Sequence, residues 1–204
     1  MPFLEKLIRA KTFVVVCIVL PGLWPVWPLL RHDPSVLADP LKYVLHHLGF
    51  VACVLLVVVL AFTPLRVLFP KSGLVQALNR HRRLVGVSAF FYALLHLATH
   101  LLYEGGFAIL ASDIKKPFLV TGLIAFTVLF ILAVTSLHRA VRWLGGRRWK
   151  QLHRLAYVAV ALVAYHQAAA RKIFPMQVLW IFVPLLLLEL LRIYRQNVPV
   201  KNEP

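Results

Sequence analysis

The feature that most constrains this chain is a series of apolar runs, several of which approach 20 residues in length. The hydrocarbon core of a bilayer is about 30 Å thick, and a helix needs about 20 residues to cross it. Backbone groups inside lipid must be satisfied within the segment, which favours helices, and the alternation typical of membrane strands is missing. With 61% hydrophobic and 15% charged residues, the chain is predicted to be an integral membrane protein.

Apolar segments of the required length define six candidate membrane spans, with ends uncertain by a few residues. They cover residues 12–30, 43–62, 83–103, 117–136, 151–168 and 174–194. The connections between them are short and no internal repeat is evident, so residues 1–204 are predicted to form a single domain. The expected fold is an all-α polytopic bundle of six transmembrane helices.

The lysine and arginine residues predict the orientation of this bundle. They gather before the first span, near residues 66–83, near residues 139–154 and after residue 191. The opposite side holds few cations and most of the seven acidic residues. The positive-inside rule therefore predicts that both termini are cytoplasmic, in agreement with an even number of spans.

The net charge of +16 also raises the question of nucleic acid binding. The cations lie in short connections at the ends of spans, where topology and anionic lipid head groups account for them. Membrane lipid is thus the expected partner of these side chains, and nucleic acid is not.

Four of the nine histidines lie within predicted spans, namely His96, His100, His153 and His166. Ionisable side chains are costly in lipid, so each one is a candidate functional residue. A single histidine can also be satisfied by a Ser or Thr on a neighbouring helix, and a pattern of several is needed to indicate a site. Histidines 32, 46 and 47 lie at the outer ends of spans, where a solvated or head-group role is expected.

Depth in the membrane relates two of these residues. His96 lies roughly 20 Å from the cytoplasmic edge of its span, and His166 roughly 22 Å from the same edge of a span that runs the same way. Two imidazoles at one depth on parallel helices can bind the two axial positions of a haem iron. His100, one turn beyond His96, is an alternative ligand or faces the outer water.

His153 lies close to the cytoplasmic edge, and its level partner would be His81. A pair formed by these two residues beneath His96 and His166 would place two haems one above the other. On ideal helices the 15 residues from His81 to His96 turn by about 60° net, whereas the 13 from His153 to His166 turn by about 220°. A kink or π-bulge would be needed, or the inner ligands differ, so one haem and two haems both stay open.

Two stretches carry a family resemblance: NRHRRLVGVSAFFYALLHLATHL at residues 79–101 and TSLHRAVRWLGGRRWKQLHRLAYVAVALVAYHQAAARK at residues 135–172. They resemble the MsrQ (YedZ) family of bacterial inner-membrane haem proteins, within the ferric-reductase-like transmembrane superfamily. The resemblance extends over essentially the whole chain. It implies that His96, His153 and His166 are linked to haem b, and it includes neither His81 nor His100.

The resemblance implies an electron conduit rather than a complete enzyme. Such proteins pass electrons from a quinone or flavin reductase on the cytoplasmic side to MsrP, a periplasmic molybdopterin enzyme that reduces methionine sulfoxide in oxidised proteins. Catalysis would then occur in the partner. FMN is also associated with the family, and without a Rossmann glycine motif it would have to dock on the helices.

Four arginines are candidates for the FMN phosphate because a guanidinium matches phosphate geometry. They are Arg82, Arg83, Arg147 and Arg148. The alternative for all four is contact with lipid head groups. Glu189 is predicted to pair with Arg192 or Arg195, about one turn away, rather than to relay protons.

Two other functions compete with the electron-transfer subunit. One is a ferric or other metal reductase component of the same superfamily, although the chain carries no NADPH or FAD domain motif. The other is a cofactor-free transporter in which the histidines relay protons.

Overall fold

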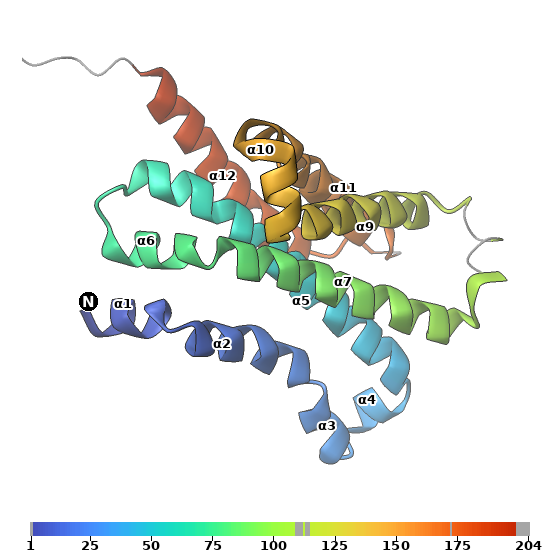
Figure 1. Cartoon of the computed structure of the whole chain (residues 1–204). Coiled ribbons are helices and arrows are strands. Elements are labelled where there is room, and N and C mark those ends of the chain that lie inside the picture. Colours follow the sequence, from blue (N-terminus) through green and yellow to red (C-terminus); the bar gives the residue numbers. More distant parts are fainter. Residues whose placement is uncertain (1, 109–111, 113–114, 172, 199–204) are drawn as a thin grey trace, which may run out of the picture.

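The structure is a computed structural model that describes residues 2–108, 112, 115–171 and 173–198. In these ranges the regular secondary structure is helical (Figure 1). The helices are α1 Pro2–Arg9, α2 Lys11–Leu23, α3 Val26–Leu30, α4 Pro34–Leu37, α5 Pro40–Leu68, α6 Gly73–Arg80, α7 Arg82–Glu104, α9 Pro117–Thr135, α10 His138–Leu152, α11 Leu155–Ala169 and α12 Gln177–Asn197. The predicted all-α membrane bundle is confirmed.

Within the described residues, four helices are long and apolar enough to cross a membrane: α5, α7, α9 and α12. The other two predicted spans correspond to the shorter apolar helices α2 and α11, with 13 and 15 residues. Proline explains the first shortening, because α2 already contains Pro21 and further prolines at positions 25 and 28 follow its end. The second arises from a turn at residues 153–154, which delays the start of α11 to Leu155. Six crossings remain a prediction.

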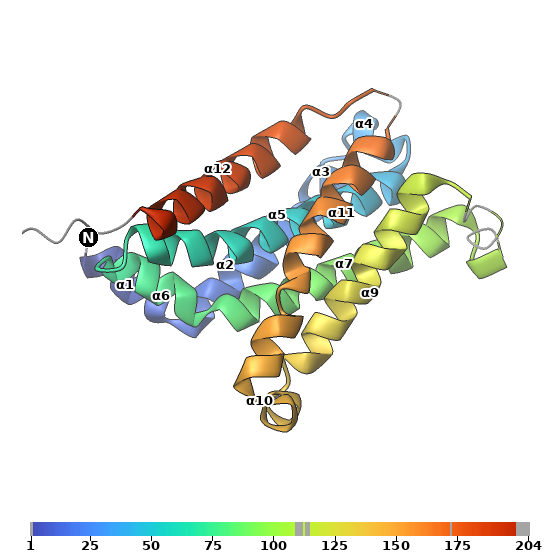
Figure 2. The ribbon, with the colours of Figure 1, turned by 90° about the horizontal axis from the view of Figure 1, so that it is seen from above.

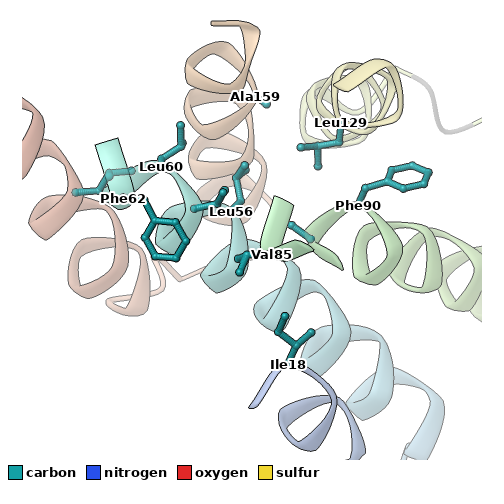
Figure 3. Close-up of a cluster of buried hydrophobic side chains, with 11 residues drawn as sticks. Ile18, Leu56, Leu60, Phe62, Val85, Phe90, Leu129 and Ala159 are labelled. Carbon is teal, nitrogen blue, oxygen red and sulfur yellow. The ribbon is translucent and has the colours of Figure 1, made fainter. Parts of the chain in front are cut away.

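Helix α5 is the central element of the bundle. It packs against α7, α12, α11 and α6, and α9 pairs with α11 beside it (Figure 2). Leu56 and Leu60 of α5 meet Phe90 of α7, Leu129 of α9 and Ala159 of α11 in the main cluster of buried side chains (Figure 3). Two antiparallel helix pairs, α5–α7 and α9–α11, thus form one apolar body.

Both ends of the described chain lie at the same end of the bundle. Helix α1 packs against α6, which follows α5, and the Arg195 guanidinium of α12 donates to the Leu68 carbonyl at the end of α5. We call this end the inner end and the opposite end the outer end, in line with the orientation expected from the charges. The arrangement agrees with an even number of crossings, and the cytoplasmic assignment stays a prediction.

The outer end is held together by one aspartate. The Asp39 carboxylate accepts a hydrogen bond from the Lys42 backbone N–H, which caps α5, and a second one from the Tyr103 hydroxyl near the end of α7. Helix α7 then ends at Gly105, whose φ of 88° is the left-handed conformation that glycine tolerates best. The two Asp39 contacts hold the outer ends of α5 and α7 together.

Candidate functional site

The structure brings together the two histidines that were predicted to share one depth. His96 of α7 and His166 of α11 lie side by side, with 6.2 Å between ring centroids and 83° between ring planes. Both rings lie in the interior, and both line the same cavity. Two antiparallel helix pairs therefore each contribute one imidazole to a common point.

Each imidazole is held by a backbone carbonyl of the helix paired with its own. The His96 Nδ1 lies 2.9 Å from the Leu45 carbonyl oxygen of α5, and the His166 Nδ1 lies 2.7 Å from the Phe118 carbonyl oxygen of α9. A carbonyl oxygen only accepts, so each Nδ1 carries the proton and donates it. The Nε2 atom of each neutral ring then keeps a lone pair, which is the state that binds a metal.

A glycine makes room for each ring. Gly49 follows Leu45 by four residues, and Gly122 follows Phe118 by four residues. In a helix these are the residues whose N–H already bonds to that carbonyl, so the ring shares the carbonyl and must approach past residue i+4. A Cβ at Gly49 would lie 2.8 Å from the His96 Nδ1, and a Cβ at Gly122 would lie 2.7 Å from the His166 Nδ1. Only glycine permits this contact.

This glycine–carbonyl–histidine unit occurs twice, once in α5–α7 and once in α9–α11. The two units are similar in their local contacts, although the sequence shows no evident internal repeat. The signal in the sequence is small: an apolar residue and a glycine four positions apart on one helix, opposite a histidine on the next. Gly49 and Gly122 are therefore site residues that the sequence pattern did not single out.

A cavity of about 450 Å³ lies between the two helix pairs. This volume is within the range of roughly 300–1,000 Å³ that is usual for small-molecule and cofactor sites. Its deeper wall is apolar and includes Leu56, Ala125 and Leu129. The part nearest the outer end also includes charged side chains, namely Lys42, Glu104 and Arg171.

The histidine pair fits a haem iron. Metal–imidazole bonds are about 2.0–2.1 Å long, so two rings on opposite sides of one metal ion have centroids roughly 6 Å apart. The observed separation of 6.2 Å matches this value. If a haem were bound in this cavity, these two imidazoles would be the residues that hold its iron, and the apolar wall beside them would surround its macrocycle.

Two further histidines, His46 and His100, line the outer part of the cavity. His46 was expected to have a solvated or head-group role because it lies at the end of a span. In the structure it lines the cavity instead. His47 does not line the cavity, and its Nε2 lies 2.6 Å from the Pro21 carbonyl oxygen of α2.

The inner pair of histidines is not assembled in the same way. The His153 ring lies against the Trp149 indole, with 4.0 Å between centroids, and its Nε2 lies 3.3 Å from the Thr135 hydroxyl. The Trp149 indole N–H donates to the Thr135 carbonyl oxygen at 3.0 Å. His81 lies between α6 and α7, where its Nε2 is buried without a hydrogen-bond partner among the described residues. Neither histidine lines the cavity.

The four arginines suggested for a phosphate are spread over two elements. Arg82 and Arg83 begin α7, and an Arg83 nitrogen lies 3.2 Å from the ring nitrogens of His138. Arg147 and Arg148 are exposed on α10, beyond the non-helical Gly145. None of the four lines the cavity.

Glu189 of α12 forms the predicted ion pair, and its partner is Arg192. The two charged groups are 2.9 Å apart, with only 13% of the glutamate side chain and 20% of the arginine side chain exposed. The Tyr157 hydroxyl of α11 donates to Glu189 at 3.2 Å and accepts from Arg192 at 3.2 Å. Arg195 binds the Leu68 carbonyl instead.

A family model and individual relatives both match this chain, and the matches agree with each other. The family model described as ferric reductase like transmembrane component matches residues 48–164, a range that includes His96 and His153 and ends just before His166. The chain is 37% identical over 173 residues to the protein-methionine-sulfoxide reductase heme-binding subunit MsrQ of Brucella anthropi, covering 77% of this chain and 76% of the relative. The protein of the same name from Brucella ovis is 36% identical over 171 residues, covering 76% and 75%.

Proposed function

Because this chain belongs to the MsrQ family of ferric-reductase-like transmembrane proteins, we propose that it is the haem b electron-transfer subunit of a protein-methionine-sulfoxide reductase system. The observation that carries the proposal is the pair His96 and His166, whose ring centroids lie 6.2 Å apart in the wall of one cavity. In this proposal their Nε2 atoms hold the iron. When bound there, the haem supplies one-electron chemistry at iron.

The surrounding residues keep the two ligands in one protonation state and one orientation. The Leu45 and Phe118 carbonyls hold the Nδ1 protons, so neither ring can rotate its Nδ1 toward the metal without losing a hydrogen bond. Leu56 and Leu129 make the deep wall apolar and exclude water from it. Because the two rings are held in place, they would move little when the iron is oxidised or reduced.

The position of the cavity favours delivery of electrons to the outer side. It opens among residues at the outer ends of helices, including Lys42, Glu104 and Arg171. We propose that the acceptor is a periplasmic molybdopterin methionine sulfoxide reductase of the MsrP type, and that the chain resides in the bacterial inner membrane. The proposed donor is a quinone or a flavin reductase at the inner end.

We propose one haem in this cavity. A second, inner haem on His153 and His81 stays a prediction, because His153 contacts Trp149 and Thr135 and neither histidine lines the cavity. FMN also stays a prediction, since its four candidate arginines are divided between the start of α7 and the exposed face of α10.

The test is the reduced-minus-oxidised absorption spectrum of the purified protein together with haem quantitation per chain. Paired histidine ligation predicts sharp reduced bands that disappear in both His96→Ala and His166→Ala. His32→Ala, a change at an exposed residue of the outer end, is the matched control and should keep the bands. A colourless preparation would favour the proton-relaying transporter instead, and bands that persist in both variants would show that the iron ligands lie elsewhere.

The acceptor is tested separately in proteoliposomes. Electrons supplied to the haem-loaded protein by a quinol should reduce methionine sulfoxide only when an MsrP-type enzyme is present. Reduction of ferric chelates with equal efficiency in the absence of that enzyme would favour the metal reductase alternative.

A further inference from the structure

The walls of the cavity change in character from its deep end to its mouth. Leu56, Ala125 and Leu129 line the deep part, whereas Lys42, Arg171 and Gln177 line the part nearest the outer end. A haem has the same asymmetry, since one edge carries only hydrocarbon groups and the other carries two propionate carboxylates. The cavity can therefore accept it in one direction better than in the other.

The two cations at the mouth come from separate elements, and both line the cavity. Lys42 lies in the first turn of α5, where its backbone N–H is bound by Asp39. Arg171 follows Ala170, the residue that caps the end of α11. Both lie close enough to His46 for their charges to act on its ring, and all three side chains line the cavity.

No carboxylate in the described part of the chain forms an ion pair with either cation. Asp39, the acid nearest to Lys42 in sequence, binds the Tyr103 hydroxyl. Glu104, at the end of α7, is the one acidic side chain among the described residues that line the cavity. Asp39 and Glu104 equal the two cations in number, but among the described residues neither acid forms an ion pair with them. Lys42 and Arg171 therefore remain available to an anionic group on a bound molecule.

We propose that Lys42 and Arg171 bind the two propionate carboxylates of the haem. The macrocycle is then inserted with its carboxylate edge toward the outer end and its apolar edge toward Leu56 and Leu129. The proposal rests on the haem function proposed above. It adds the direction of insertion and two residues that contact the cofactor without touching the iron.

Two measurable consequences follow. A charge-assisted hydrogen bond to a carboxylate slows the release of the bound group, so loss of one cation should speed haem dissociation by about tenfold. Loss of a positive charge near the iron also favours the ferric state over the ferrous state, so the midpoint potential should fall. A purely structural role for these side chains predicts neither a charge-dependent potential nor its recovery by another cation.

The experiment compares full-length, haem-loaded Lys42→Met, Arg171→Met and the double variant with Lys42→Arg, which keeps the charge. Lys115→Met is the matched control, because this exposed lysine lies near the outer end and does not line the cavity. Haem transfer to excess apomyoglobin gives the dissociation rate, and a redox titration gives the midpoint potential. We expect faster dissociation by about tenfold in each Met variant, more in the double variant, and a lower potential in all three. Lys42→Arg and Lys115→Met should match the wild type.

Unchanged dissociation and potential in the double variant, while the wild type carries haem, would overturn this proposal and leave the haem function intact. A wild-type protein without haem would overturn both. The same phosphate- and carboxylate-binding chemistry could serve anionic lipid, so the measurements are repeated in detergent with and without added phosphatidylglycerol. An effect seen only with the lipid present would assign the two cations to head groups and would also overturn the proposal.

Discussion

The His96 and His166 imidazoles lie side by side, with 6.2 Å between ring centroids, and each donates its Nδ1 proton to the carbonyl of a different helix. The two contacts are equivalent. The Leu45 carbonyl accepts from His96 beside Gly49, and the Phe118 carbonyl accepts from His166 beside Gly122. The helix pairs α5–α7 and α9–α11 thus present their rings to the cavity by the same device. A metal held between them would meet the same ligand chemistry on both sides.

The two glycines should be as important to haem binding as the histidines themselves. In Gly49→Ala or Gly122→Ala the new Cβ would lie under 3.0 Å from the histidine Nδ1, so the ring must move away from its carbonyl. We expect the haem content per chain to fall by about tenfold in each variant, because the ligand loses both its position and its hydrogen bond. Extraction of haem and its quantitation per chain measure this.

Gly86 of α7 is the matched control for these substitutions. A Cβ there would meet only a Val59 methyl group at 3.7 Å, an ordinary contact. Gly86→Ala also improves helix propensity by about 1 kcal/mol. It should keep full haem content, and an equal loss of haem in this variant would show that the effect comes from general disturbance of the bundle.

The depth of His96 and His166 could be predicted from the sequence because the rise of a helix per residue is constant. The carbonyl partners could not, since they depend on how closely α5 approaches α7 and α9 approaches α11, which periodicity does not specify. Lys42 and Arg171 were missed for another reason. A cation at the end of a span fits the topology rule equally well whether it faces lipid or a cavity.

The orientation of the bundle can be tested with reporter fusions. A reporter that is active only in the periplasm should be active after Gly106, which follows α7 at the outer end, and silent after Gly145 of α10 at the inner end. A fusion after Asp33, beyond the short helix α2, should also be active if α2 and α3 together cross the membrane. Inactivity at Asp33 with activity at Gly106 would contradict the six-span prediction.

The ion pair between Glu189 and Arg192 should stabilise the inner half of the bundle. Glu189→Ala leaves the largely buried Arg192 charge without its partner, and breaking a buried pair in this way costs about 3–5 kcal/mol of the free energy of unfolding. The melting temperature in detergent should therefore fall clearly. The more exposed pair of Glu5 and Arg9 on α1 is the control, because Glu5→Ala should cost only about 0.2–1 kcal/mol. Equal shifts in the two variants would show that burial does not govern these pairs.

Substitution of His153 distinguishes a protein with one haem from a protein with two haems. Its ring lies against Trp149, its Nε2 lies near the Thr135 hydroxyl, and it does not line the cavity that holds His96 and His166. We therefore expect His153→Ala to keep the full haem content and an unchanged midpoint potential, since an iron held by the other two histidines does not contact residue 153. His153 and Trp149 lie toward the inner end, on the side of the proposed donor, so reduction by that donor should become slower. Loss of about half the haem, with an unchanged potential for the remainder, would instead establish an inner haem site that is energetically independent of the outer one.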